Sequence, residues 1–237
     1  MYNILIFDLD DTLTDNYENV KEAFKFLLKN RNEKYTQEKF EKFHKIDIET
    51  WRARANGKII TPFENDLKKK VEWIRASRFI RFYGENNITY EDAVKSNDIY
   101  MEGMKQKVVP QKNAYEIIKY LYERKYRIII ATNGPKVALS SKLEKLGINK
   151  FIELTFCSEE IGFMKPHENY YKGLLKKANI KNKNEILFIG DDLEKDIKGG
   201  IQNNLDTCWC NYNNIVNNTN YKPKYEINSL LELKSIL

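Results

Sequence analysis

Short apolar runs alternate with longer amphipathic stretches at the start of the chain and throughout its second half. Runs rich in Ile, Leu and Phe are typical of buried strands, and apolar residues at three- and four-residue spacing are typical of helices. The pattern predicts strands at residues 3–8, 126–132, 153–157, 185–190 and 206–210. It predicts helices among them at residues 112–124, 136–146, 167–178 and 193–203. Such alternation is typical of a parallel sheet covered on both faces, so we predict an α/β core.

The alternation stops between the first strand and residue 108. Helical patterns without an intervening strand cover residues 17–30, 36–56, 63–83 and 89–106. We therefore predict two domains: a core of residues 1–15 and 108–237, and an all-helical cap domain of residues 16–107 inserted after the first strand. A polar loop at 211–220 precedes a last short strand and helix.

The chain does not have the pattern of a membrane protein. Its 237 residues are enough to bury a full core in one or two domains. No apolar run approaches the ~20 residues of a membrane span, and the N-terminus passes into the first strand without a basic segment. We expect a cytoplasmic protein with no membrane partner, either a monomer or a homodimer.

The net charge of +6 raises the question of nucleic acid. Lysines and acids are interspersed, and the only cationic triplet is at 68–70, so we expect no nucleic-acid polymer as partner. A mild positive field would instead attract a phosphorylated small molecule. The cysteines, Cys157, Cys208 and Cys210, form no CxxC pair, and we interpret them as reduced residues of strands.

Two acids follow the first apolar run. Asp8 and Asp10 are two positions apart, so side-chain alternation in an extended segment puts both carboxylates on the same side. Paired acids at the end of a strand can bind a hard cation, or divide nucleophilic and acid/base roles between them. A single DxD is more often a solvated turn, so the interpretation depends on the rest of the chain.

Three later segments contain further residues suited to phosphate chemistry. The strand at 126–132 ends in Thr132-Asn133-Gly134, where a hydroxyl and backbone N–H groups at a helix start can bind a phosphoryl oxygen. Lys165 stands before a proline, and the strand at 185–190 leads into an acidic segment at 191–196. Each segment alone is typical of a cap, a turn or an acidic helix start. Together they indicate one site, because open α/β sheets bind ligands at the carboxyl ends of their strands.

This order of segments resembles the four motifs of the haloacid dehalogenase-like (HAD) superfamily. The matching positions are 8–12, 132, 165 and 190–196. The surrounding residues at 158–166, 196–200 and 205–209 are similar to those of a narrower branch, the bacterial house-cleaning pyrimidine 5′-nucleotidases. The resemblance covers residue 4 to about residue 200, and it implies a Rossmannoid core whose active site lies under the cap.

The resemblance also implies a role for each motif residue. Asp8 would be the nucleophile that forms an aspartyl-phosphate, and Asp10 the acid and base that serves the leaving group and the water. Mg²⁺ would be held by Asp8, the backbone carbonyl of Asp10 and Asp191, with Asp196 or Asp192 fixing its waters. The groups expected to bind phosphate are Thr132, Asn133 with its backbone N–H, and Lys165.

The acid at position 10 also narrows the reaction class. Dehalogenases and phosphonate hydrolases of this superfamily lack an acid there, whereas its phosphatases and mutases have one. We therefore expect a Mg²⁺-dependent phosphomonoesterase acting on nucleoside 5′-monophosphates. The alternatives are a phosphatase or phosphomutase acting on a sugar or other small-molecule phosphate, and a catalytically idle binding protein. The last predicts a missing catalytic residue, and none is missing.

Several residues have two interpretations. Asp192 stands where the branch has a small hydroxyl residue, and we favour a cap of the next helix for Asp192 and the metal for Asp191. Arg78 belongs to an aromatic and basic cluster of the cap, and we select it as the residue that sets substrate specificity; the alternative is a structural role. His44 and His167 are the only histidines, and we interpret both as structural.

Overall fold

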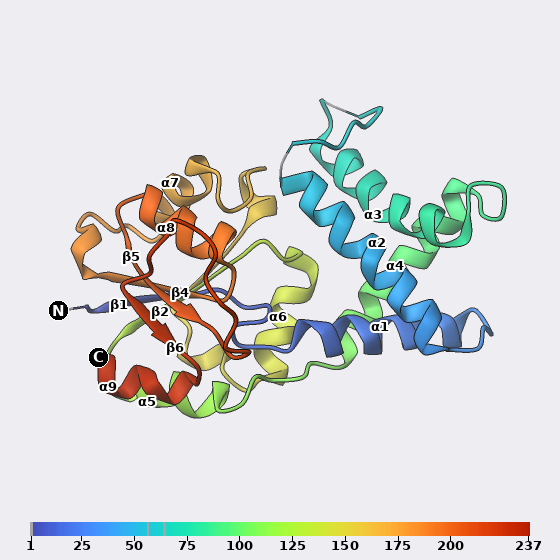
Figure 1. Ribbon diagram of the computed structural model, residues 1–237. Coiled ribbons are helices and arrows are strands. Elements are labelled where there is room, and N and C mark those ends of the chain that lie inside the picture. The colour runs from blue at the N-terminus through green and yellow to red at the C-terminus, as the bar shows by residue number, and fades with distance from the viewer. Residues whose placement is uncertain (1, 56, 64) are drawn as a thin grey trace. The chain divides into compact units, whose positions relative to one another are not determined.

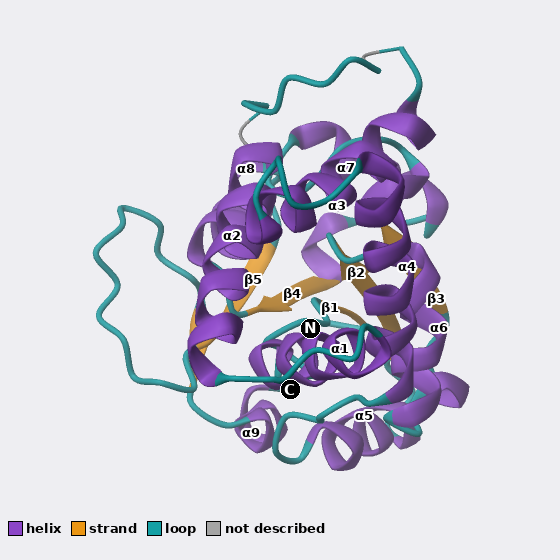
Figure 2. Ribbon diagram, turned by 90° about the vertical axis from the view of Figure 1, so that its right-hand side faces the viewer, coloured by secondary structure: helices purple, strands orange, loops and turns teal. Residues whose placement is uncertain are grey.

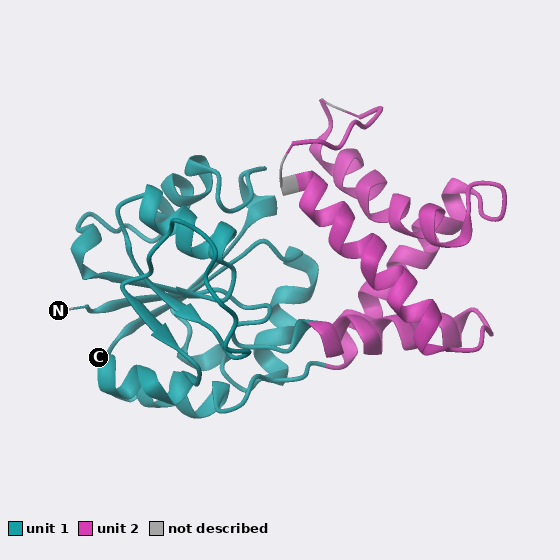
Figure 3. Cartoon of the chain, in the orientation of Figure 1, with its two compact units in different colours: residues 1–16, 108–237 teal, residues 17–107 magenta. Residues whose placement is uncertain are grey.

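The computed structural model describes residues 2–55, 57–63 and 65–237, which fall into two compact units. Unit 1 comprises Met1–Asn16 and Val108–Leu237, and unit 2 comprises Tyr17–Lys107 (Figure 3). Unit 2 is therefore inserted into unit 1 shortly after the first strand. Its placement over an active site, as a cap, stays a prediction.

Unit 1 is built on one parallel sheet (Figure 1). Within the described residues the strands are β1 (Ile4–Phe7), β2 (Arg127–Thr132), β3 (Leu154–Cys157), β4 (Ile186–Gly190), β5 (Asp206–Cys210) and β6 (Tyr225–Ile227). They lie in the order β3-β2-β1-β4-β5-β6, and each neighbouring pair is parallel. The α/β prediction is confirmed, and the bounds of the five predicted core strands differ by at most one residue at either end.

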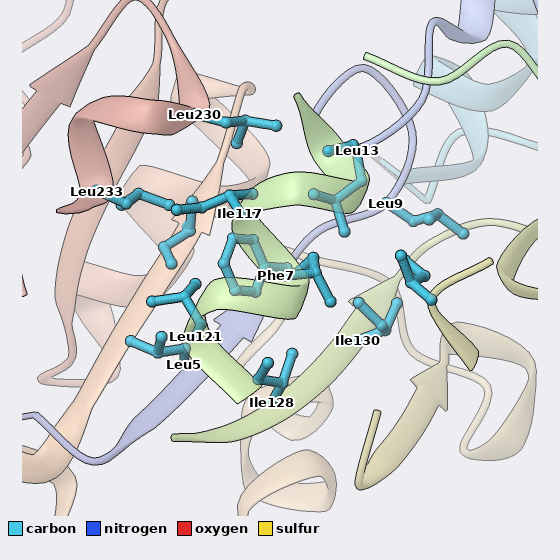
Figure 4. Packing of buried hydrophobic residues seen from close by; sticks show 14 of the residues in the cluster. Leu5, Phe7, Leu9, Leu13, Ile117, Leu121, Ile128, Ile130, Leu230 and Leu233 are labelled. Carbon is cyan, nitrogen blue, oxygen red and sulfur yellow. The ribbon is translucent and has the colours of Figure 1, made fainter. Parts of the chain in front are cut away.

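The sheet is apolar on both faces because helices cover both. The helices of unit 1 are α5 (Ala114–Glu123), α6 (Lys136–Lys145), α7 (Glu168–Lys177), α8 (Lys198–Gln202) and α9 (Leu233–Ile236). Helices α7 and α8 lie on one side of the sheet and α5 and α9 on the other (Figures 1 and 2). Leu5 and Phe7 of β1 pack with Ile117 of α5, as Figure 4 shows, whereas Ile4 and Ile6 pack on the α7 face. This double burial explains the continuous apolar run of β1.

The predicted helix at 193–203 is divided in two. A π-helical turn, η4 (Leu193–Ile197), precedes α8. The carbonyl of Asp192 accepts from the backbone N–H groups of Asp196 and Ile197, and the Tyr171 hydroxyl donates to the carbonyl of Lys195. This wider turn contains the buried Asp196, and such turns are frequent at functional sites.

The described residues of unit 2 form helices joined by loops, without a strand. Its helices are α1 (Asn16–Asn30), α2 (Gln37–Ala55), α3 (Leu67–Tyr83) and α4 (Tyr90–Gln106). Helix α3 begins four residues later than predicted because the Asp66 side chain caps it, accepting from the backbone N–H of Lys69. Residues 56 and 64, which belong to predicted helices, lie outside the described part. Stacked rings of Phe24, Phe43 and Phe79 form the centre of this unit.

Candidate active site

Three carboxylates meet at the carboxyl edge of the sheet. Asp8 follows β1 and Asp191 follows β4, and these two strands are hydrogen-bonded neighbours. Asp196 reaches the same place from η4. One carboxylate oxygen of each residue lies within 4.8 Å of the others, and Asp8 and Asp196 are buried. The structure thus brings together three of the predicted metal-binding residues.

Lys165 is the cation of this cluster. Its Nζ donates to Asp8 Oδ1 at 2.5 Å, to Asp196 Oδ1 at 2.6 Å and to the carbonyl of Ala131 at 3.0 Å. These three bonds use every donor of an ammonium group. The side chain is 1% exposed, so its charge acts on the carboxylates with little screening by water.

The carboxylate cluster contains more acidic groups than the single ammonium of Lys165 can neutralise. Burial raises the pKa of Asp8 to about 7, against the opposing effect of the Lys165 ammonium. Burial and the charges of Asp196 and Asp8 also raise the pKa of Asp191 well above its ordinary value. Burial lowers the pKa of Lys165, but Asp196 and Asp8 raise it by more. One ammonium for three carboxylates favours the binding of a further cation.

The turn after β2 holds the Lys165 loop in place. The side-chain Oδ1 of Asn133 accepts from the backbone N–H of Lys165 at 2.8 Å, and its Nδ2 donates to the carbonyl of Lys165 at 3.1 Å. Thr132 Oγ1 accepts from the backbone N–H of Gly134 at 2.8 Å. The Asn133 side chain is thus occupied, and its predicted phosphate contact would be made by its backbone N–H.

Asp10 lies beside this turn and is more exposed than Asp8. Its Oδ1 accepts from the Thr14 hydroxyl at 3.2 Å and forms an ion pair with Lys142 Nζ. Lys142 is not among the site residues predicted from the sequence. The available signal was its position: with Ala138, Leu139 and Leu143 it lies on the buried face of α6, where a lysine is unusual.

Asp192 is a helix cap. Its Oδ1 accepts from the backbone N–H groups of Glu194 and Lys195, both at 2.9 Å, and its Oδ2 pairs with Lys195 Nζ. The interpretation of Asp192 as a cap is confirmed. Asp191 instead belongs to the carboxylate cluster, and its Oδ1 accepts from the Thr12 hydroxyl at 3.0 Å.

The histidines and cysteines lie outside the carboxylate cluster. His167 caps α7 by accepting at Nδ1 from the backbone N–H of Asn169, and His44 stacks on Phe40. Both contacts are structural, as interpreted. The three cysteines are buried and free, as expected for reduced thiols.

The order of the motifs along the chain and their convergence at the carboxyl edge of the sheet agree with the comparison to known proteins. Residues 2–204 match the profile of the haloacid dehalogenase-like hydrolases. The chain belongs to this family. The HAD hydrolase is therefore an enzyme, with the fold and the motif arrangement expected from its sequence.

Individual relatives are similar over most of their length. The chain is 30% identical to the HAD-hydrolase YfnB of Bacillus subtilis over 237 residues, all of this chain and 95% of that one. A crystal structure of YfnB bound to magnesium superposes with a TM-score of 0.85 at 29% identity, covering 100% and 98% of the two chains. The pyrimidine 5′-nucleotidase PynA of Streptococcus pneumoniae is 27% identical, covering 100% and 95%. The glyceraldehyde 3-phosphate phosphatase of Methanocaldococcus jannaschii is 28% identical, covering 82% and 78%.

The residues of this HAD hydrolase fit Mg²⁺. The donors of the cluster are carboxylate oxygens on adjacent strand ends, and oxygen ligands select hard cations such as Mg²⁺ over zinc. The excess of carboxylates over ammonium groups supplies the charge that a divalent cation needs.

Among the described helices, none has the length and apolar character required to cross a membrane.

Mg²⁺ is expected to stabilise the HAD hydrolase more at pH 8 than at pH 5.5. The pKa of Asp8 is about 7, above the unfolded value, so without metal its contribution to stability is present at low pH and lost as pH rises through about 7. The deprotonated cluster then binds the cation, which stabilises by about 2.7 kcal/mol at a concentration of 100 Kd. Thermal unfolding with and without MgCl₂ measures this. A stabilisation that does not grow with pH, or that persists in Asp191→Asn, contradicts the assignment.

Arg78 lies inside unit 2. Its guanidinium is 2% exposed, forms an ion pair with Asp47 at 2.5 Å and donates to Asn97 Oδ1 at 3.0 Å. Trp51 and Tyr100 lie against it. These contacts give Arg78 a structural role, and its predicted part in substrate specificity stays a prediction.

Arg78→Leu is expected to destabilise unit 2. The change would leave the Asp47 carboxylate buried without its cation, which costs about 3–5 kcal/mol. Chemical unfolding measures the loss. Arg81→Leu is the control, because Arg81 pairs with Glu49 where both side chains are exposed. Unchanged stability together with a raised KM would contradict the structural role and support the one in specificity.

Proposed function

We propose that the protein is a Mg²⁺-dependent phosphomonoesterase that works through an aspartyl-phosphate on Asp8. The observation that supports this most is the pair of acids at one strand end. Asp8 is buried against Lys165, whereas Asp10 is partly exposed beside the Thr132–Gly134 turn. Two acids in different environments can take different roles.

The proposed reaction has two steps. A carboxylate oxygen of Asp8 attacks phosphorus, the bond from phosphorus to the leaving oxygen breaks, and Asp10 donates a proton to that oxygen. Asp10 then accepts a proton from the water that attacks phosphorus, and the bond to Asp8 breaks, which releases inorganic phosphate. Bound Mg²⁺ would supply positive charge to the transferring oxygens.

The remaining residues would hold the phosphoryl group. Lys165 Nζ lies 2.5 Å from Asp8 Oδ1, so a phosphoryl group bound to Asp8 would lie near this ammonium. The Thr132 hydroxyl and the backbone N–H of Asn133 stand at the end of the neighbouring strand. Positioning and charge neutralisation of this kind are most of what phosphoryl transfer requires.

For the substrate we propose nucleoside 5′-monophosphates, with pyrimidines preferred. The similarity to PynA over nearly the full length of both chains supports this. A sugar or other small-molecule phosphate is the second candidate, supported by the similarity to a glyceraldehyde 3-phosphate phosphatase. A phosphomutase would retain phosphate on the product instead of releasing it.

Phosphate release with Mg²⁺ across nucleoside monophosphates, sugar phosphates and polyol phosphates tests the proposal. Preference for pyrimidine 5′-monophosphates supports the nucleotidase. Release selective for sugar phosphates supports the second candidate and contradicts the first. No release from any compound contradicts the phosphomonoesterase.

A further inference from the structure

Lys142 occupies a core position with a charged side chain. It lies on the buried face of α6 with Ala138, Leu139 and Leu143, and it is 2% exposed. An ammonium buried in this way loses its hydration and requires a partner. Its Nζ forms an ion pair with Asp10 Oδ1, 132 positions earlier in the chain. Helix α6 therefore supplies a cation to Asp10.

The two oxygens of Asp10 have different surroundings. Oδ1 accepts from Lys142 and from the Thr14 hydroxyl. Oδ2 lies toward Gly134, where an added Cβ would come within 2.9 Å of Oδ2 and within 3.1 Å of Thr132 Oγ1. The carboxylate is thus held through one oxygen, and the other faces the turn that would bind phosphate.

Three segments meet in a narrow crevice at this place: the residues after β1, the end of β2 with the turn that follows it, and helix α6. Its lining includes Leu9, Asp10, Thr132, Gly134, Leu139 and Lys142. Asp10 contacts Lys142 of the helix through Oδ1 and approaches the turn after β2 through Oδ2, so it lies between this cation and the predicted phosphate site.

We infer that Lys142 is a positioning residue for Asp10: it holds Oδ1 so that Oδ2 is presented to the leaving oxygen of the substrate. The inference rests on the proposed function. It predicts that the loss of Lys142 slows the reaction more for a substrate whose leaving group must be protonated than for one whose leaving group departs without a proton. A purely structural Lys142 predicts the same change for every substrate.

Two substrates separate these roles. Uridine 5′-monophosphate has an alkoxide leaving group that needs a proton, whereas the phenolate of p-nitrophenyl phosphate leaves without one. The ratio kcat/KM reports the step in which the leaving group departs. Lys142→Met keeps the length of the side chain and its burial, and Lys145→Met is the control on the exposed face of the same helix.

Lys142→Met is expected to lower kcat/KM for uridine 5′-monophosphate by about tenfold to a hundredfold, because a misplaced acid loses much of its effect. For p-nitrophenyl phosphate we expect less than about a threefold loss, since little proton transfer is needed there. Lys145→Met should match the wild type with both compounds. In an Asp10→Asn background, Lys142→Met should cause no further loss.

The outcomes separate the inference from the proposed function. Equal losses for both compounds, or an unchanged Lys142→Met beside an impaired Asp10→Asn, overturn the inference alone. A further loss in the Asp10→Asn background also overturns it, because Lys142 would then act by another route. No phosphate release by the wild type overturns the proposed function and the inference together. Thermal unfolding of Lys142→Met shows whether its loss of activity comes from misfolding. Lys142→Gln, which keeps a polar group at this position, is the second variant for the same comparison.

Discussion

Asp8→Asn is expected to lower kcat by on the order of 10⁴-fold or more, because an amide cannot replace the attacking carboxylate. Asparagine has nearly the same shape, so the fold should persist. The change also removes one of three crowded carboxylates, and burial raises the pKa of the one removed, Asp8. The metal-free variant should therefore be at least as stable as the wild type at pH 8. Phosphate release and thermal unfolding of the purified variant measure both effects.

The matched control is Asp206→Asn. Asp206 begins β5, at the strand end opposite the carboxylate cluster, and pairs with Lys224. Its loss should leave turnover unchanged. Turnover by Asp8→Asn close to that of the wild type would exclude Asp8 as nucleophile.

Lys165→Met has the second large expected effect. It should abolish activity and lower the free energy of unfolding of the metal-free protein by about 3–5 kcal/mol, because Asp8 and Asp196 would lose their buried cation. The loss should be larger at pH 8 than at pH 5, because burial raises the pKa of Asp8 and its unpaired carboxylate takes up a proton as pH falls. Denaturant unfolding at the two pH values measures it.

Mg²⁺ should restore part of the stability of Lys165→Met, because a divalent cation can neutralise the same carboxylates. Activity should not return, since the ammonium near the phosphoryl group is still missing. Lys172→Met is the control, because Lys172 forms an exposed pair with Glu168 on α7. Equal stability of Lys165→Met and Lys172→Met without metal would contradict the role given to Lys165.

The sequence predicted the core and much of the carboxylate cluster for a physical reason. Strands buried on both faces, such as Ile4–Phe7, leave an unbroken apolar run. The residues directly after such runs, Asp8 and Asp191, meet because adjacent parallel strands end at the same edge. Asp196 followed from the resemblance to a known motif.

Other features depend on tertiary contacts that a local pattern does not contain. The ion pair of Lys142 with Asp10 joins a helix to a strand end far away in the chain. The burial of Arg78 depends on Asp47 and Asn97 from two neighbouring helices. In the wide turn at Leu193–Ile197, the carbonyl of Lys195 accepts from the hydroxyl of Tyr171 on another helix. Each of these contacts forms only in the packed fold, so the local sequence pattern does not predict it.

The most direct test of the account is to locate the covalent intermediate. The protein would be mixed with Mg²⁺ and its best substrate from the panel, quenched in acid during turnover, digested and analysed by mass spectrometry. We predict a phosphoryl group on the peptide that contains Asp8, absent without Mg²⁺ and absent in Asp8→Asn. A phosphoryl group on another residue, or undiminished turnover by Asp8→Asn with none on the protein, would contradict the proposed mechanism.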